Sequence, residues 1–287
     1  MKARVLVAVS VLCICGLMVV GQSKKRPSPS PSPTPDIWGT YEGVNWQKGP
    51  SVGQLGINGE VKVPEGYLFA NARDTRTIME ENKNPITNRE LGLIAPAGET
   101  WFAVFEFDDV GYVKDDEKTS LDANEILESI KKGTEEGNKE RTRRGWPTMT
   151  IIGWETAPRY NEITHNLEWA IRAQSEGSPV INHNTRVLGR GGVMEVTLVA
   201  DPAVLAETMP KFKAMLEGFE FKQGQRYAEF RAGDKTAAYG LTGLIVGGGT
   251  AALVKTGAFK WIWKGLVAAA LAIGAFVKKL FSRRSEA

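Results

Sequence analysis

Arg159, Tyr160 and His165 bring three different polar groups into one short, turn-rich stretch of the chain. The guanidinium of Arg159 is able to bind an anion through two parallel hydrogen bonds. The imidazole of His165 exchanges a proton near neutral pH, so it is a candidate proton donor. The stretch therefore predicts a site for an anionic ligand, bound by all three side chains. The alternative is structural: Arg159 pairs with a carboxylate of the sheet, and His165 fills a strand position.

A run of acidic residues between positions 108 and 117 offers carboxylates for metal binding or acid–base chemistry. The run lacks the alternate spacing and the central glycine of a calcium-binding loop, so no metal site is predicted. A solvated end of a β-hairpin explains these charges more simply. If the chain is an enzyme, Asp109 and Asp115 with His165 are the candidates for general acid–base catalysis, although no residue is assigned as catalytic.

Cysteine and histidine are too scarce for several common chemistries. The two cysteines, Cys13 and Cys15, both lie in the first apolar segment, and the chain has only two histidines. This excludes a structural disulfide or a thiol nucleophile in the rest of the chain, and also a cysteine- or histidine-rich zinc site. The sequence predicts no cofactor. Whether the protein is an enzyme stays open, with a preference for a non-enzymatic role.

The elements that would position these residues alternate between strands and helices. Asp122 followed by Glu125 is a capping box, which opens a charged helix that ends near Arg144. Asp201-Pro202 opens a second helix with apolar residues at three- and four-residue steps. Apolar runs predict strands at 54–63 (a hairpin turning at Asn58-Gly59), 101–107, 149–156, 167–173, 180–187 and 193–200. We therefore predict an α+β domain over residues 38–235, with a mostly antiparallel sheet and two main helices packed on it.

Both ends of the chain combine apolar runs with basic residues. Residues 1–23 have the basic start and apolar run of a signal peptide or an N-terminal anchor. Residues 24–37 form a basic spacer rich in proline and serine, which favours an extended conformation. Residues 236–281 are predicted to be a membrane-associated helical region, and residues 282–287 form a basic tail. Two runs in that region, 236–254 and 259–277, are each long enough to cross a bilayer as a helix.

The C-terminal region also carries residues suited to helix packing and to the membrane interface. Gly243 and Gly247 have the spacing that lets two membrane helices approach closely. The predicted interface anchors are Trp261, Trp263, Lys278, Lys279, Arg283 and Arg284. If the middle of the chain is exported, a basic tail on the cytoplasmic side requires one net crossing. Which of the two runs makes that crossing is left open.

The distribution of charge limits the partners of the domain. The formal net charge is +3, but residues 36–235 hold 24 lysines and arginines against 32 aspartates and glutamates. An acidic domain repels phosphate backbones, so we do not expect nucleic acid as a partner. The basic ends favour a lipid bilayer. An envelope protein or a glycan is the candidate partner of the domain itself.

Several sequence blocks resemble a bacterial family. They are VPEGYLF near Val63, FDDVGYVKDDE near Phe107, GWETAPRYNEITHNLEWA from Gly153, NTRVLGRGGV from Asn184 and FKQGQRYAEFRAGDKTAAYGL from Phe221. Over about residues 50–285 the chain is similar to predicted membrane-anchored proteins filed as a domain of unknown function. The resemblance implies a membrane anchor after an extracytoplasmic domain, and nothing about activity. Residues 165–219 also resemble, in topology, half of a PsbP/Mog1-type accessory domain.

Three functions are compatible with these observations. The preferred one is a non-enzymatic binding or accessory module of the bacterial envelope, anchored in the cytoplasmic membrane with its domain facing the periplasm or the outside. The second is an envelope hydrolase or transferase that uses carboxylates and His165. The third is a helper of a membrane complex that faces the cytoplasm, which requires that the first segment is not a true signal. The oligomeric state and the ligand are left open.

Overall fold

The computed structural model describes residues 38–82, 84 and 86–247. The expected signal or anchor at 1–23 and the expected spacer at 24–37 lie outside these residues. The same is true of residues 248–281, which include most of the expected membrane region, and of the tail at 282–287. The anchors from Trp261 to Arg284 therefore also lie outside the described residues.

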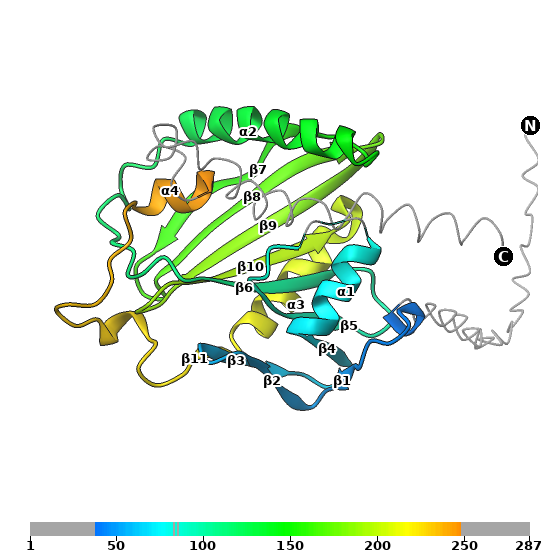
Figure 1. The fold of residues 1–287 in the computed structure, drawn as a ribbon, viewed down its shortest axis with the longest axis horizontal. Coiled ribbons are helices and arrows are strands. Elements are labelled where there is room, and N and C mark those ends of the chain that lie inside the picture. Colours follow the sequence, from blue (N-terminus) through cyan, green and yellow to red (C-terminus); the bar gives the residue numbers. More distant parts are fainter. Residues whose placement is uncertain (1–37, 83, 85, 248–287) are drawn as a thin grey trace, which may run out of the picture. The chain divides into compact units, whose positions relative to one another are not determined.

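The fold is built on an eight-stranded sheet with the strand order β1-β4-β5-β6-β10-β9-β8-β7. Every neighbouring pair in this sheet is antiparallel. Its strands are β1 (Gln47–Lys48), β4 (Tyr67–Asn71), β5 (Glu90–Pro96), β6 (Phe102–Asp108), β7 (Met149–Asn161), β8 (Asn166–Ser175), β9 (Ser178–Leu188) and β10 (Val193–Ala200). The long strands β7 to β10 follow one another as a meander (Figure 1).

A second, three-stranded antiparallel sheet has the order β11-β3-β2. It consists of β2 (Ser51–Leu55), β3 (Gly59–Val63) and β11 (Phe219–Phe221). The hairpin predicted over 54–63 is confirmed, but its turn is not at Asn58-Gly59. Leu55 pairs with Gly59, so the turn is made by the three residues between them, with Gly56 in the left-handed region at φ 63°.

Within the described residues, four α-helices accompany the sheets: α1 (Ala72–Glu81), α2 (Ala123–Arg143), α3 (Leu205–Leu216) and α4 (Leu241–Val246). The side chain of Asp122 caps α2 by accepting from the backbone N–H groups of Asn124 and Glu125, as the sequence predicts. Asp201 caps a 3₁₀ turn, Pro202–Val204, that leads into α3. The two helices predicted as the main ones are therefore α2 and α3.

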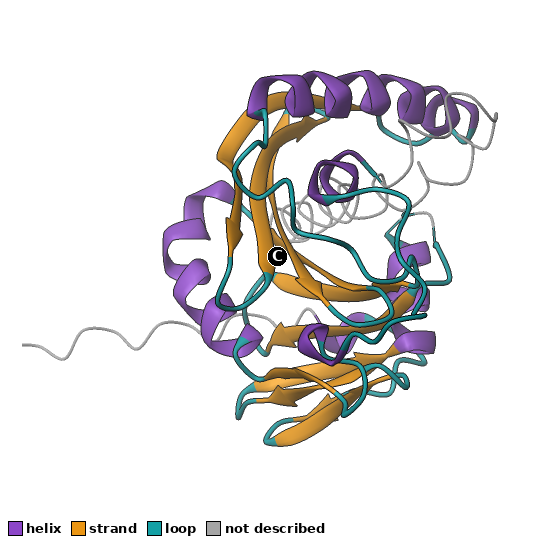
Figure 2. Ribbon diagram, turned by 90° about the vertical axis from the view of Figure 1, so that its left-hand side faces the viewer, coloured by secondary structure: helices purple, strands orange, loops and turns teal. Residues whose placement is uncertain are grey.

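The large sheet has a different hydrophobic layer on each face. We call the face that packs against α1, α2 and α4 the inner face, and the one that packs against α3 and the small sheet the outer face. Phe102 and Val104 of β6 point inward with Leu244 of α4, while Phe105 points outward with Phe212 of α3. Figure 2 shows the sheet curved, with helices on both sides of it. The predicted α+β class with a large antiparallel sheet is confirmed.

The acidic run at 108–117 does not form a hairpin end, so that prediction is wrong. The strand β6 pairs with β5 and β10, and the chain after Asp108 does not turn back along it. Instead the run crosses the end of the sheet towards α2, and Tyr112 forms an isolated bridge with Thr236.

Residues 236–247 continue the domain, whereas the sequence analysis starts the membrane-associated region at residue 236. The backbone of Ala237 donates to the carbonyl of Tyr112, and Leu241, Leu244 and Ile245 are buried in the inner core. The helix α4 has only six residues and ends at Gly247, which has φ 95°. Among the described residues, no helix has the length and the apolar composition needed to cross a membrane.

Candidate functional site

The turn between β7 and β8 brings together three of the residues singled out from the sequence. The hydroxyl of Tyr160 donates to Oδ2 of Asp115 at 3.1 Å and lies 3.1 Å from Nδ1 of His165. A phenol has one proton to donate. Since Asp115 takes that proton, the phenol oxygen accepts from His165, which places a proton on Nδ1. His165 itself sits in the turn, with φ 53°, and not in a strand.

Aromatic rings hold this group in place from the other side. The ring of His165 lies 4.5 Å from that of Tyr227, which stacks on Tyr112 at 4.4 Å. The hydroxyl of Tyr227 donates to the backbone carbonyl of Val113. Burial, followed by the charge of Asp115, raises the pKa of Tyr160, so its phenol stays protonated at neutral pH. Tyr227 was not expected at this site, because a residue in a short 3₁₀ turn far along the chain gives no local signal.

Arg159 and Asp109 lie apart from this group. Arg159 and Tyr160 are successive residues of β7, so their side chains point to opposite faces of the sheet. Arg159 forms an ion pair of 3.1 Å with Glu168, its cross-strand neighbour on β8. Asp109 is exposed and forms a loose ion pair of 3.6 Å with Lys235. The predicted anion-binding triad is thus divided between the two faces.

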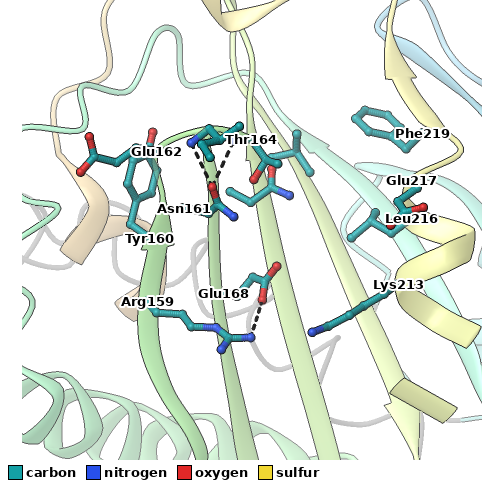
Figure 3. Close-up of a pocket in the computed structure, with 13 residues that line it drawn as sticks. Arg159, Tyr160, Asn161, Glu162, Thr164, Glu168, Lys213, Leu216, Glu217 and Phe219 are labelled. Atoms are coloured by element: carbon teal, nitrogen blue, oxygen red, sulfur yellow. Dashed lines mark hydrogen bonds and ion pairs between the residues drawn. The ribbon is translucent and has the colours of Figure 1, made fainter. Parts of the chain in front are cut away.

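The outer face carries an open cleft of about 860 Å³ beside Arg159. One wall is the β7–β8 turn, and the other is the end of α3 with the start of β11 (Figure 3). Arg159 and Lys213 approach Glu168 from opposite sides. The apolar lining residues are Ile163, Val187, Leu216 and Phe219. Ile163 is 90% exposed at the tip of the turn, where the side chain of Asn161 accepts from the backbone N–H groups of Ile163 and Thr164.

A row of buried charges crosses the inner face. Glu90, Glu106, Glu195 and Arg186 are consecutive cross-strand neighbours on β5, β6, β10 and β9. Arg186 lies 3.3 Å from Glu195 and over the ring of Trp169. Burial opposes ionisation of Glu195, but Arg186 and then Arg89 bring its pKa below the ordinary value. This row was not expected from the sequence. A single glutamate in each of the apolar strands VFEF and VMEVTLV nevertheless indicates a buried charge.

Two further positions complete the comparison with the sequence. Gly243 and Gly247, expected in membrane helix packing, lie in and at the end of α4. A Cβ on Gly243 would come within 2.7 Å of the Tyr239 side chain, so this glycine allows α4 to pack against its own preceding loop.

Among the described residues, no group of three or more His, Cys, Asp or Glu side chains is arranged to hold a metal ion.

The fold and the site together define an α+β domain with an antiparallel sheet, a hydrogen-bonded tyrosine–histidine group and an open cleft. The chain belongs to the family described as protein of unknown function (DUF2167), whose sequence pattern matches residues 47–277. A comparison with curated proteins gives no match.

A comparison with solved structures gives two distant similarities. One is the solution structure of cyanobacterial PsbP (CyanoP) from Synechocystis sp. PCC 6803, with a TM-score of 0.35 and 10% identity, covering 62% of this chain and 92% of that one. The other is PA94 from Pseudomonas aeruginosa, a protein of unknown function, with a TM-score of 0.25 and 12% identity, covering 58% and 93%. At these TM-scores the likeness carries no argument about function.

Proposed function

We propose that the protein is a non-enzymatic binding or accessory module of the bacterial envelope. In this proposal it is anchored in the cytoplasmic membrane, its domain faces the periplasm or the outside, and its basic tail is cytoplasmic. The order of the segments supports the placement: a basic apolar start, a proline-rich spacer, an acidic domain and a basic apolar end. The partner is an envelope protein or glycan that docks in the cleft beside β7 and β8.

The observation that carries the proposal is the cleft with Ile163 at its edge. Unlike a single exposed side chain, Ile163, which is 90% exposed, shares the cleft with Val187, Leu216 and Phe219, so a partner in the cleft would bury apolar surface on both walls. Next to it, Arg159, Glu168 and Lys213 offer charges of both signs at the cleft wall. An apolar contact beside exchangeable ion pairs is the composition of a protein-binding surface.

Photocrosslinking tests the cleft directly. The full chain carries p-benzoylphenylalanine at position 163 in the native membrane, and crosslinked products are compared with those from position 57. Ile57 is a matched control, because it is also exposed, at 80%, but lies in the turn between β2 and β3. We expect a discrete adduct from position 163 that Lys213→Glu weakens. Equal products from both positions would contradict a specific cleft partner.

The orientation of the domain needs its own test. Ser129 is exposed on α2, and Ser129→Cys gives a single thiol outside the first apolar segment, where both natural cysteines lie. Labelling of intact spheroplasts with a membrane-impermeant maleimide is the expected result. Protection until lysis would place the domain in the cytoplasm, which fits a cytoplasmic-facing helper of a membrane complex instead.

One observation favours an alternative, an envelope hydrolase or transferase. Tyr160 fixes the proton of His165 on Nδ1 while Asp115 holds the phenol, which leaves the other ring nitrogen able to act as a base. This reading requires that His165→Ala and Asp115→Asn abolish the cellular phenotype while the protein accumulates normally. A phenotype that depends on Ile163 and Lys213 but not on His165 supports the binding module.

A further inference from the structure

The middle of the inner face contains more carboxylates than its arginines can neutralise. Glu90, Glu106 and Glu195 stand side by side on β5, β6 and β10, and none is more than 7% exposed. Asp108 follows on β6. Arg89 bridges Asp108 at 3.1 Å and Glu195 at 3.3 Å. Arg186 pairs with Glu195 from β9.

The hydroxyl of Thr87 shows how the excess charge is relieved. Its Oγ1 lies 2.9 Å from Oε1 of Glu90 and 2.8 Å from Oε1 of Glu106, and it accepts from the backbone N–H of Arg89 at 3.1 Å. A hydroxyl donates one proton and accepts two hydrogen bonds. The single hydroxyl proton of Thr87 is therefore shared by two carboxyl oxygens, and a proton on one of the two glutamates relieves the repulsion between them.

Glu106 is the better placed of the two to hold that proton. Glu90 already accepts from the backbone N–H of Thr87 through Oε1, the same oxygen that contacts the Thr87 hydroxyl, so this oxygen acts as an acceptor. Glu106 lies between two other glutamates of the row. Burial is the first cause that raises the pKa of Glu106, to about 7, and Arg89 opposes it. A proton on Glu106 leaves the hydroxyl of Thr87 to donate to Glu90.

The remaining groups around Glu106 connect it to the C-terminal part of the domain. On the side of α1, Arg76 reaches the backbone carbonyl of Glu90. On the side of α4, which has no titratable residue of its own, the hydroxyl of Tyr239 donates to Oδ2 of Asp108 at 3.4 Å. Arg89 thus holds Asp108 in place, and Asp108 holds the loop that leads into α4.

We propose that Glu106 is a proton-binding switch that controls the docking of residues 236–247 on the inner face. With the proton bound, Arg89 is free to bridge Asp108 and Glu195, and Tyr239 is held. When the proton leaves, Arg89 is drawn to the new charge on Glu106 and its contact with Asp108 weakens. The hydrogen bond from Tyr239 and the packing of α4 then weaken with it.

The direction of the pH dependence follows from linkage. An ordinary glutamate has a pKa of 4.5, and Glu106 in the folded domain has a pKa of about 7. Between these values the docked state keeps a proton that an opened state with a solvated glutamate loses. The equilibrium constant for opening therefore rises with pH by at most about tenfold per unit, and is flat above the upper pKa. The titration of Glu106 therefore weakens docking as the pH rises from about 5 to about 7.

Amide hydrogen exchange of the full chain in detergent micelles tests the proposal. Peptides covering 236–247 are compared at about pH 5 and about pH 8, corrected for intrinsic exchange rates, with β10 as the internal reference. We expect protection of 236–247 to fall about tenfold or more in the natural protein. In Glu106→Gln, whose amide donates to Thr87 as the acid does, the fall should be less than about twofold. Glu90→Gln is the matched control: the fall should remain but be smaller, because this variant removes one of the charges that raise the pKa of Glu106.

Two results would overturn the proposal. One is an unchanged protection of 236–247 between the two pH values, or a fall that Glu106→Gln does not remove. The other is a loss of the pH effect in Glu90→Gln but not in Glu106→Gln. That result would show that Glu90, and not Glu106, holds the proton. An infrared spectrum at about pH 6 detects a protonated carboxyl group directly and does not depend on amide exchange. A buried carboxylic acid band that is absent in Glu106→Gln supports the assignment, and no such band contradicts it.

Discussion

The buried row on the inner face and the cleft on the outer face use the same residue types in opposite surroundings. The side chains of Arg186 and Glu195 in the row are 3% and 9% exposed, whereas those of Arg159 and Glu168 in the cleft are 58% and 19% exposed. A buried charge that loses its partner has no water to replace it. A charge at an open cleft exchanges its partner for water or for a ligand at little cost.

In the proposed function, this difference separates the structural role of the row from the binding role of the cleft. The row is fixed by the register of four strands and is the place where a single proton changes the balance of charge. The cleft lies where β7 and β8 end in a turn, and its charges are free to be reorganised by a partner. The two regions should therefore respond differently to the same kind of substitution.

The largest expected difference comes from removing one arginine in each region. Arg186→Ala leaves Glu195 with only Arg89 in a buried position and should lower the free energy of unfolding by about 3–5 kcal/mol. Arg159→Ala, the matched control, should lower it by less than about 1 kcal/mol. Urea unfolding of the full chain, followed by tryptophan fluorescence, measures both. Similar losses would mean that burial does not distinguish the two pairs.

A smaller effect is expected from the hydroxyl that joins Glu90 to Glu106. Thr87→Val keeps the shape of the side chain but removes the hydrogen bonds to both carboxyl groups, at a cost of about 1–3 kcal/mol. Thr142→Val is the control, since Thr142 is exposed on α2 and its hydroxyl bonds only within that helix. The control should change the stability by less than about 0.5 kcal/mol. If both variants unfold alike, the Thr87 contacts are not significant in solution.

Much of the fold was predictable from local patterns. The cap at Asp122 and the apolar strands from 149 to 200 appear where the sequence places them, because capping and side-chain alternation depend on neighbouring residues. The acidic run after Asp108 was wrongly predicted to be a hairpin end. The strand before it lies in the middle of the sheet and pairs with β5 and β10, and such pairings with distant parts of the chain leave no local signal. Residues 236–247 were misjudged for a related reason: a glycine-rich apolar segment has the same composition whether it packs on protein or on lipid.

The candidate site was predictable in part. Asp115, Tyr160 and His165 do come together, but Arg159 does not join them, and strand alternation within β7 already implies that Arg159 and Tyr160 point apart. The buried row requires the register of four strands, and the sequence specifies none of these pairings directly. The role of Tyr227 as a stacking partner of His165 also depends on how a distant loop returns to the sheet.

The hydrogen bonds of Tyr160 should contribute less than the buried row, because this group is only partly buried. Tyr160→Phe and Asp115→Ala should each lower the free energy of unfolding by about 1 kcal/mol. The double variant should lose less than the sum of the two, since both remove the same bond. Thermal unfolding of the four proteins completes the double-mutant cycle. Strictly additive losses would show that the phenol and the carboxylate do not interact in solution.

The smallest effect on stability is expected from a substitution of Ile163, at the tip of the turn between β7 and β8. Ile163→Ser should change the free energy of unfolding by less than about 0.5 kcal/mol, because Ile163 is 90% exposed and the backbone bonds to Asn161 are kept. The same variant should reduce capture of the partner by a crosslinker placed at Leu216, on the facing wall of the cleft. Ile57→Ser should alter neither quantity. A stable Ile163→Ser protein with undiminished crosslinking would remove the turn between β7 and β8 from the binding surface and leave α3 as its main part.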